Sequence, residues 1–121
     1  MDLGNLWPDI DQLLMDVAQE LQKLILSQSD QIVEDVGGGA KVKMTLYSIG
    51  RKDNVLAVIG MGKDHCKLYL HHTDKIDTRE LVLQGKGKHA KTLWIRNLHE
   101  MDRESINFAL EQITQIALEK A

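Results

Sequence analysis

The middle of the chain contains three strand-like segments that are joined by very short polar turns. Residues 42–49 and 65–72 alternate apolar and polar side chains, whereas residues 55–61 are apolar on both faces. The connections at residues 50–54 and 62–64 are rich in residues that favour turns. Connections this short join antiparallel neighbours, because parallel strands need a long crossover. The segment therefore predicts an antiparallel sheet in which residues 55–61 form a central strand.

Apolar residues recur at helical spacing near both ends of the chain, which predicts two amphipathic helices. The stripes consist of Leu14, Val17, Leu21, Leu24 and Ile25 at one end and of Ile106, Ala109, Leu110, Ile113 and Ala117 at the other. Residues 32–36 and 91–97 have strand character, and a short helix is expected around residues 78–82. We predict an α+β fold, in which a twisted antiparallel sheet of about five strands packs against the N- and C-terminal helices.

The length and the cysteine content indicate one domain in a reducing compartment. A chain of 121 residues fits a single domain over residues 1–121. Cys66 is the only cysteine, so no internal disulfide holds the fold together. No apolar run approaches the length of a transmembrane helix, and the N-terminus lacks the pattern of a signal peptide. These features predict a cytoplasmic protein without a membrane partner.

A loop rich in glycine and lysine, residues 85–91, is the most distinctive segment. It contains Lys86, Lys88, His89 and Lys91, and Arg96 follows without an intervening acid. Glycines let backbone N–H groups turn toward an anion, so a phosphate, a carboxylate or an acidic patch on a partner protein fits this loop. Nucleic acid fits less well, because the chain has a net charge of -3. The alternative is a turn whose lysines are only solvated.

Three aromatic residues form a second candidate site. By strand alternation Tyr47, Tyr69 and Trp94 point away from the main aliphatic residues of their strands, so they are expected on the sheet face opposite the helices. Such a face suits a protein partner, a small ligand or a second copy in a homodimer. The alternative is a minor core beneath a loop.

The sequence contains no recognisable catalytic residues, metal site or cofactor motif. His65 and His71 share a face of their strand but lie roughly 20 Å apart at about 3.3 Å per residue, far beyond the span of one metal site. Cys66 and His65 face opposite ways, and Cys66 is expected to be a buried apolar residue rather than a nucleophile. We therefore expect a non-enzymatic binding module. Acidic residues of the first helix could instead bind a hard cation weakly, namely Asp9, Asp16 and Glu20.

The segment Gly85-Lys86-Gly87-Lys88-His89-Ala90-Lys91-Thr92-Leu93-Trp94-Ile95-Arg96-Asn97-Leu98, followed by Met101-Asp102, resembles the YdhG-like family of bacterial domains of unknown function. That family has a Gly-x-Gly-Lys loop, a basic strand and an acidic residue before the last helix. The likeness spans residues 10–119 and is weaker over 42–70, where Lys43-Met44-Thr45 replaces a frequent Gly-x-Pro step. It implies a secretion-chaperone-like α+β fold. Because some relatives are regarded as frataxin-like, it also implies an alternative role as an intracellular iron chaperone.

Overall fold

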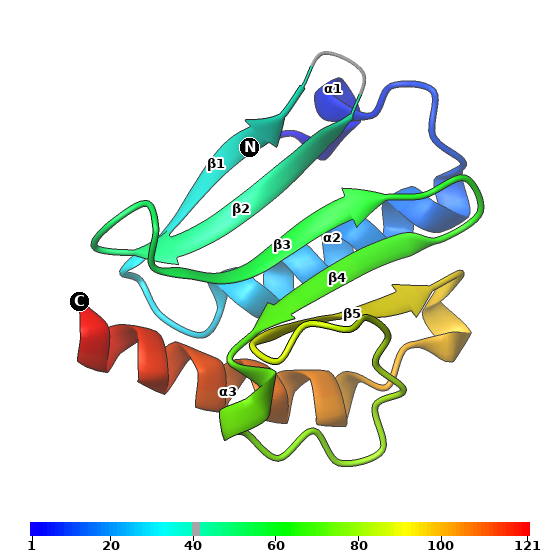
Figure 1. Cartoon of the computed structure of the whole chain (residues 1–121). Helices are drawn as coiled ribbons and strands as arrows, with labels where there is room; N and C mark the ends of the chain where they lie inside the picture. The colour runs from blue at the N-terminus through cyan, green and yellow to red at the C-terminus, as the bar shows by residue number, and fades with distance from the viewer. Residues whose placement is uncertain (40–41) are drawn as a thin grey trace.

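A computed structural model describes residues 1–39 and 42–121, and it consists of one five-stranded sheet and two long helices (Figure 1). The chain begins with a single helical turn, α1 (Leu3–Leu6), and helix α2 (Gln12–Leu26), and it ends with helix α3 (Arg103–Lys120). The strands are β1 (Ile32–Gly38), β2 (Lys43–Ile49), β3 (Val55–Met61), β4 (Cys66–His71) and β5 (Ala90–Ile95). Two short 3-10 turns, η1 (Thr73–Lys75) and η2 (Leu98–Glu100), flank β5. The predicted α+β fold is confirmed.

The strands follow one another across the sheet in chain order, and every neighbouring pair is antiparallel. Short turns account for the pairing of β2, β3 and β4, because strands joined this closely pair as antiparallel neighbours, whereas residues 72–89 connect β4 to β5. The register shifts once, between Tyr47 and Ser48 of β2, where Leu56 of β3 is the extra residue. Such a bulge increases the local twist of the sheet.

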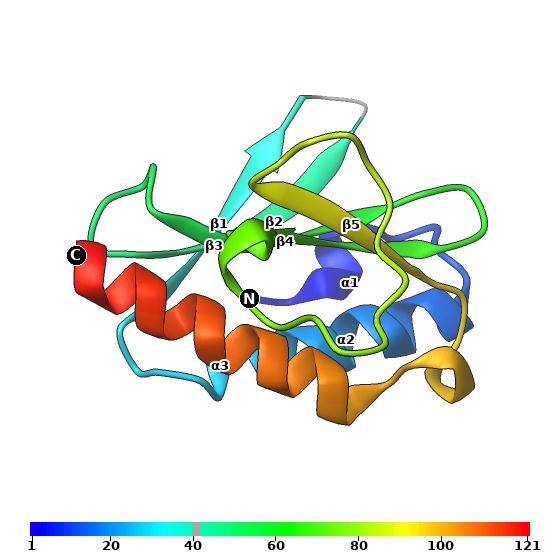
Figure 2. The ribbon, with the colours of Figure 1, turned by 60° about the horizontal axis from the view of Figure 1, so that its bottom comes forward.

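Helices α2 and α3 lie side by side on one face of the sheet, and no helix of the described residues covers the other face, which we call the open face (Figure 2). Aspartates begin both helices, because the side chain of Asp11 accepts a hydrogen bond from the N–H of Leu13 and that of Asp102 accepts one from Ser105. The bond with Ser105 lowers the pKa of the Asp102 carboxyl, so this cap is ionised at neutral pH. None of the described helices is long and apolar enough to cross a membrane.

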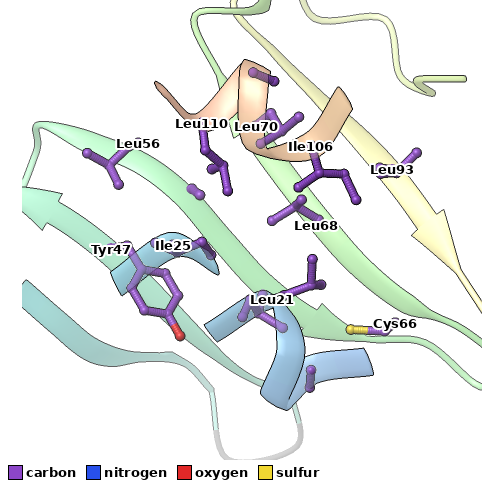
Figure 3. Close-up of a cluster of buried hydrophobic side chains, with 14 of the residues drawn as sticks. Leu21, Ile25, Tyr47, Leu56, Cys66, Leu68, Leu70, Leu93, Ile106 and Leu110 are labelled. Atoms are coloured by element: carbon purple, nitrogen blue, oxygen red, sulfur yellow. The ribbon is translucent and has the colours of Figure 1, made fainter. Parts of the chain in front are cut away.

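The hydrophobic core lies between the two helices and the sheet (Figure 3). Leu21 of α2 and Leu110 of α3 pack toward Leu68 of strand β4, which lies next to the central strand β3, and all three are fully buried. Cys66 lies in the same layer, as expected, and burial raises the pKa of its thiol to about 12. Because the thiolate is the nucleophilic form, Cys66 is chemically inert in the folded protein.

The predicted position of Tyr47 is wrong, because this side chain is in the core rather than on the open face. Tyr47 is 0% exposed and pairs with Ala57, and its neighbour on the same face is Thr45. Strand β2 carries apolar side chains on both faces, so alternation alone cannot show which face is buried. Its aliphatic residue Leu46 lies instead on the open face, where it covers Gly37 of β1.

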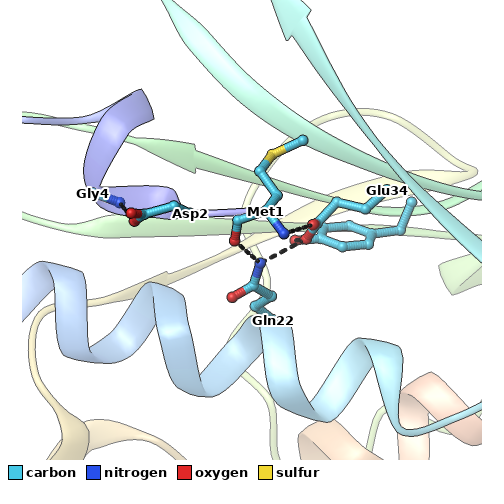
Figure 4. Close-up of polar contacts among 6 residues, drawn as sticks. Met1, Asp2, Gly4, Gln22 and Glu34 are labelled. Atoms are coloured by element: carbon cyan, nitrogen blue, oxygen red, sulfur yellow. Dashed lines mark hydrogen bonds and ion pairs between the residues drawn. The ribbon is translucent and has the colours of Figure 1, made fainter.

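A buried carboxylate explains how the core accommodates the tyrosine hydroxyl. The Tyr47 hydroxyl donates a 2.7 Å hydrogen bond to Oε2 of Glu34, which also accepts one from Gln22. The amino group of Met1 lies 3.5 Å from the other oxygen of Glu34 (Figure 4). Each polar group therefore has a partner, which is the condition for burying such groups at low cost.

The predicted short helix at residues 78–82 is absent, and an irregular segment connects η1 to β5 instead. Gln112 of α3 bonds both the N–H and the C=O of Asp77, and the Arg79 guanidinium lies 3.8 Å from the centre of the Phe108 ring. Arg79 also has a φ of 50°, which a right-handed helix cannot contain. Contacts with α3 therefore take the place of helical hydrogen bonds and hold this segment beside the helix (Figure 1).

Candidate functional site

The glycine- and lysine-rich loop forms one wall of an open hollow of about 510 Å³ at the start of β5. The opposite walls come from η1 and from the irregular segment that follows it. We call this feature the lysine hollow, and it is lined by Thr73, Asp74, Thr78, Leu81, Leu83, Lys86, Gly87, Lys88 and Lys91. Three of the lysines predicted to bind an anion therefore share one site.

Backbone contacts bring these walls together. Gln84 forms a two-bond antiparallel bridge with Thr92 of β5, with both N···O distances at 2.8 Å. Gly85 then reverses the chain with a φ of 116°, a conformation that glycine adopts without strain. The N–H of Thr73 bonds the C=O of His89, which ties η1 to the end of the loop.

Positive charge dominates the lysine hollow. Lys86, Lys88 and Lys91 face a single carboxylate, that of Asp74. Nδ1 of His89 lies 3.0 Å from this carboxylate. Burial alone would raise the pKa of Asp74, but the hydrogen bond and charge of His89 outweigh it and hold the pKa below its ordinary value. The one group in the hollow that would repel an anion is therefore hydrogen-bonded to His89.

The lysine hollow also offers hydrogen-bond donors. The backbone N–H groups of Lys86, Gly87 and Lys88 donate to no group among the described residues. The hydroxyl of Thr73 is shielded from solvent, and among the described residues it has no hydrogen-bond partner either. The loop N–H groups are exposed and therefore available to an anion in place of water, whereas the Thr73 hydroxyl is buried, where polar groups normally have partners.

The remaining predicted residues do not join this site. Arg96 follows the far end of β5, where its guanidinium lies 4.0 Å from Glu100. Trp94 is 38% exposed on the open face, and Tyr69 lies on the same face, where it covers Gly60. Lys91 pairs with the core residue Leu70 and so points to the helix side of the sheet. The structure therefore places Trp94 and Tyr69 on the sheet face opposite to that of Lys91.

The open face carries a stacked pair that the sequence did not predict. The rings of His65 and Trp94 lie 4.1 Å apart and nearly parallel, and Lys67 lies 6.0 Å from the centre of the Trp94 ring. His65 also lies against Gly62, where no larger residue would fit beside the imidazole. Trp94 is thus partly covered by its own chain, which reduces the apolar surface available to a partner.

Metal-ligating groups stay apart. Over residues 1–39 and 42–121, no three histidine, cysteine or acidic side chains are close enough to hold one ion. Two of the three acidic residues considered for a hard cation are engaged elsewhere: Asp16 accepts a hydrogen bond from Gln12, and Glu20 pairs with Arg103 at 3.3 Å, whereas Asp9 precedes α2. The arrangement of the first helix therefore offers little to a hard cation.

Two adjacent histidines should make stability fall as the solution becomes mildly acidic. Burial lowers the pKa of His71, and burial together with the charge of Lys120 lowers that of His72. Below the unfolded value of about 6.5 the unfolded chain takes up these protons more readily, so the free energy of unfolding should decrease from pH 7 toward pH 5. The pKa values of Asp64 and Asp74 are also lowered, but these carboxyl groups change the free energy of unfolding only at a more acidic pH than the histidines do.

Urea denaturation of wild type and of His71→Gln/His72→Asn between pH 5 and 7 measures this effect. Asparagine is chosen at position 72 because His72 has a φ of 60°, which asparagine tolerates. The variant should show a flatter pH dependence than wild type. Equal slopes for the two proteins would contradict this assignment.

No family model matches the chain, and neither a curated protein nor a solved structure is significantly similar to it. The resemblance to the YdhG-like family therefore stays a prediction, and function must be argued from the site itself.

Half of the lysine hollow was not predicted. Thr73, Asp74, Thr78, Leu81 and Leu83 precede the loop by up to twelve residues and reach it only through tertiary contacts. Their one sequence signal is a few apolar residues, among them Leu81 and Leu83, in a mostly polar segment, which is typical of a segment that packs on a core.

Proposed function

We propose that this domain is a non-enzymatic binding module that holds a small anion in the lysine hollow. One observation carries the proposal: Lys86, Lys88 and Lys91 line a single hollow together with only one carboxylate, that of Asp74. Lysines normally spread apart when they serve only solubility, because like charges repel at short range. The convergence of three ammonium groups with free backbone donors supports anion binding.

Thermal unfolding in inorganic phosphate tests the proposal. A ligand that binds only the folded state stabilises it in proportion to the logarithm of its concentration. At constant ionic strength, phosphate at millimolar concentration should raise the unfolding temperature of wild type by a few degrees. The variant Lys86→Gln/Lys88→Gln/Lys91→Gln should lose this rise.

A matched control separates binding from general salt effects, since phosphate also stabilises proteins non-specifically. Lys23→Gln/Lys52→Gln/Lys63→Gln removes the same charge from exposed lysines that lie outside the lysine hollow. This control should keep the wild-type response to phosphate. The proposal fails if the two triple variants respond alike.

A third variant tests the sign of the electrostatics. Asp74→Asn removes the only negative charge that lines the lysine hollow. Phosphate should then bind about two- to fivefold more tightly, as expected for removing one partly solvated charge several ångströms from the ligand. Weaker binding would show that the carboxylate supports the site by holding His89 rather than opposing the anion.

A further inference from the structure

The charge of the lysine hollow matches a ligand with two negative charges. Three ammonium groups and the carboxylate of Asp74 leave two positive charges on its walls. A monoanion would leave one of these uncompensated, whereas a dianion balances both. A small dianion therefore fits the site best, whether it is a phosphate monoester or a dicarboxylate.

The type of donor favours phosphate over carboxylate. Arginine provides the planar fork that matches a carboxylate, and no arginine lines the lysine hollow. Lysine ammonium groups act as point charges, which can surround the three terminal oxygens of a tetrahedral phosphate from different sides. The free N–H groups of the 86–88 segment add donors of the kind that bind phosphate in glycine-containing loops.

The other residues that line the lysine hollow indicate the chemistry of the rest of the ligand. Thr73 and Thr78 line the hollow and Thr78 provides a hydroxyl, Leu81 and Leu83 provide an apolar surface, and the volume of about 510 Å³ leaves ample room beside a phosphate group. No aromatic side chain lines the lysine hollow, so a nucleobase would find no stacking partner. A short body with hydroxyls on an aliphatic skeleton fits these walls.

We infer that the ligand is a phosphate monoester of a small, non-aromatic, hydroxylated molecule. Its phosphate lies among Lys86, Lys88 and Lys91, and its body lies between the threonines and the leucines of the lysine hollow. This inference rests on the proposed function, because it names the ligand class of the same site.

Calorimetric titration with four small molecules tests the ligand class. Glycerol 3-phosphate is the monoester, dimethyl phosphate is a tetrahedral monoanion, succinate is a dicarboxylate and adenosine monophosphate carries an aromatic base. Glycerol 3-phosphate should bind at least tenfold more tightly than dimethyl phosphate or succinate. Adenosine monophosphate should bind no more tightly than glycerol 3-phosphate. Succinate binding as tightly as glycerol 3-phosphate would overturn the inference and leave anion binding standing. If none of the four molecules binds and inorganic phosphate has no effect on unfolding, both the ligand class and the proposed anion binding are overturned.

A substitution in the lining of the lysine hollow tests where the part of the ligand other than its phosphate lies. Thr78→Val removes a hydroxyl of the lysine hollow and preserves the shape of the side chain. The variant should bind glycerol 3-phosphate severalfold more weakly than wild type does, and its affinity for inorganic phosphate should be unchanged. Equal affinity of wild type and variant for glycerol 3-phosphate would contradict the placement of the body against this wall.

Discussion

Tyr47→Ala should destabilise the domain by about 3–5 kcal/mol, because it empties a fully buried site of aromatic size. The same change also leaves the carboxylate of Glu34 without its 2.7 Å hydrogen bond. Tyr47→Phe keeps the ring and loses only this bond, so a cost of about 1–3 kcal/mol is expected for it. Urea denaturation followed by circular dichroism measures both free energies of unfolding.

Trp94→Ala is the matched control for the core position of Tyr47. Trp94 belongs to the same predicted set of aromatic residues but is 38% exposed and loses mainly its stacking on His65. It should cost less than half as much as Tyr47→Ala. Comparable losses for the two variants would show that Trp94, too, supports a core.

Leu68→Ala should cost about 2–5 kcal/mol, because Leu68 is fully buried on β4, a strand that both helices contact. The cavity is expected to stay open, since neighbouring residues such as Leu21 and Leu110 are anchored on different helices. The free energy of unfolding from urea titration measures this loss.

Tyr69→Ala changes the adjacent residue, whose side chain lies on the open face and covers Gly60. It should cost less than half of the free energy of unfolding lost by Leu68→Ala, because Tyr69 is partly exposed whereas Leu68 is fully buried. If Tyr69→Ala proves the more destabilising of the two, the open face is covered in solution.

Strand β4 shows when strand alternation is sufficient to predict a face. Its buried residues Cys66, Leu68 and Leu70 alternate with the polar or amphipathic residues Lys67, Tyr69 and His71, so only one orientation buries the apolar set. Strand β2 has no such contrast, because Leu46 and Tyr47 are both large and apolar. Its orientation is decided by the buried partner of the tyrosine hydroxyl, Glu34, which lies on another strand.

The candidate site was predictable only where its residues are close in sequence. The glycines and lysines of the loop identify one wall, because this local composition already suggests an anion site. The other walls depend on the bonds between Gln112 and Asp77 and on the bridge from Gln84 to Thr92, which join distant segments. Arg96 shows the converse, because closeness in sequence did not bring it into the lysine hollow.

The most direct test of anion binding is a map of backbone amide shifts of the labelled protein during titration with inorganic phosphate. The largest changes should occur at Lys86, Gly87 and Lys88 and extend to η1 across the lysine hollow. A second basic hollow, lined by Arg51 and Lys120 among others, provides the internal comparison and should show little change. Shifts centred on Arg51 and Lys120, or spread evenly over all exposed lysines, would contradict the assignment of the lysine hollow as the binding site.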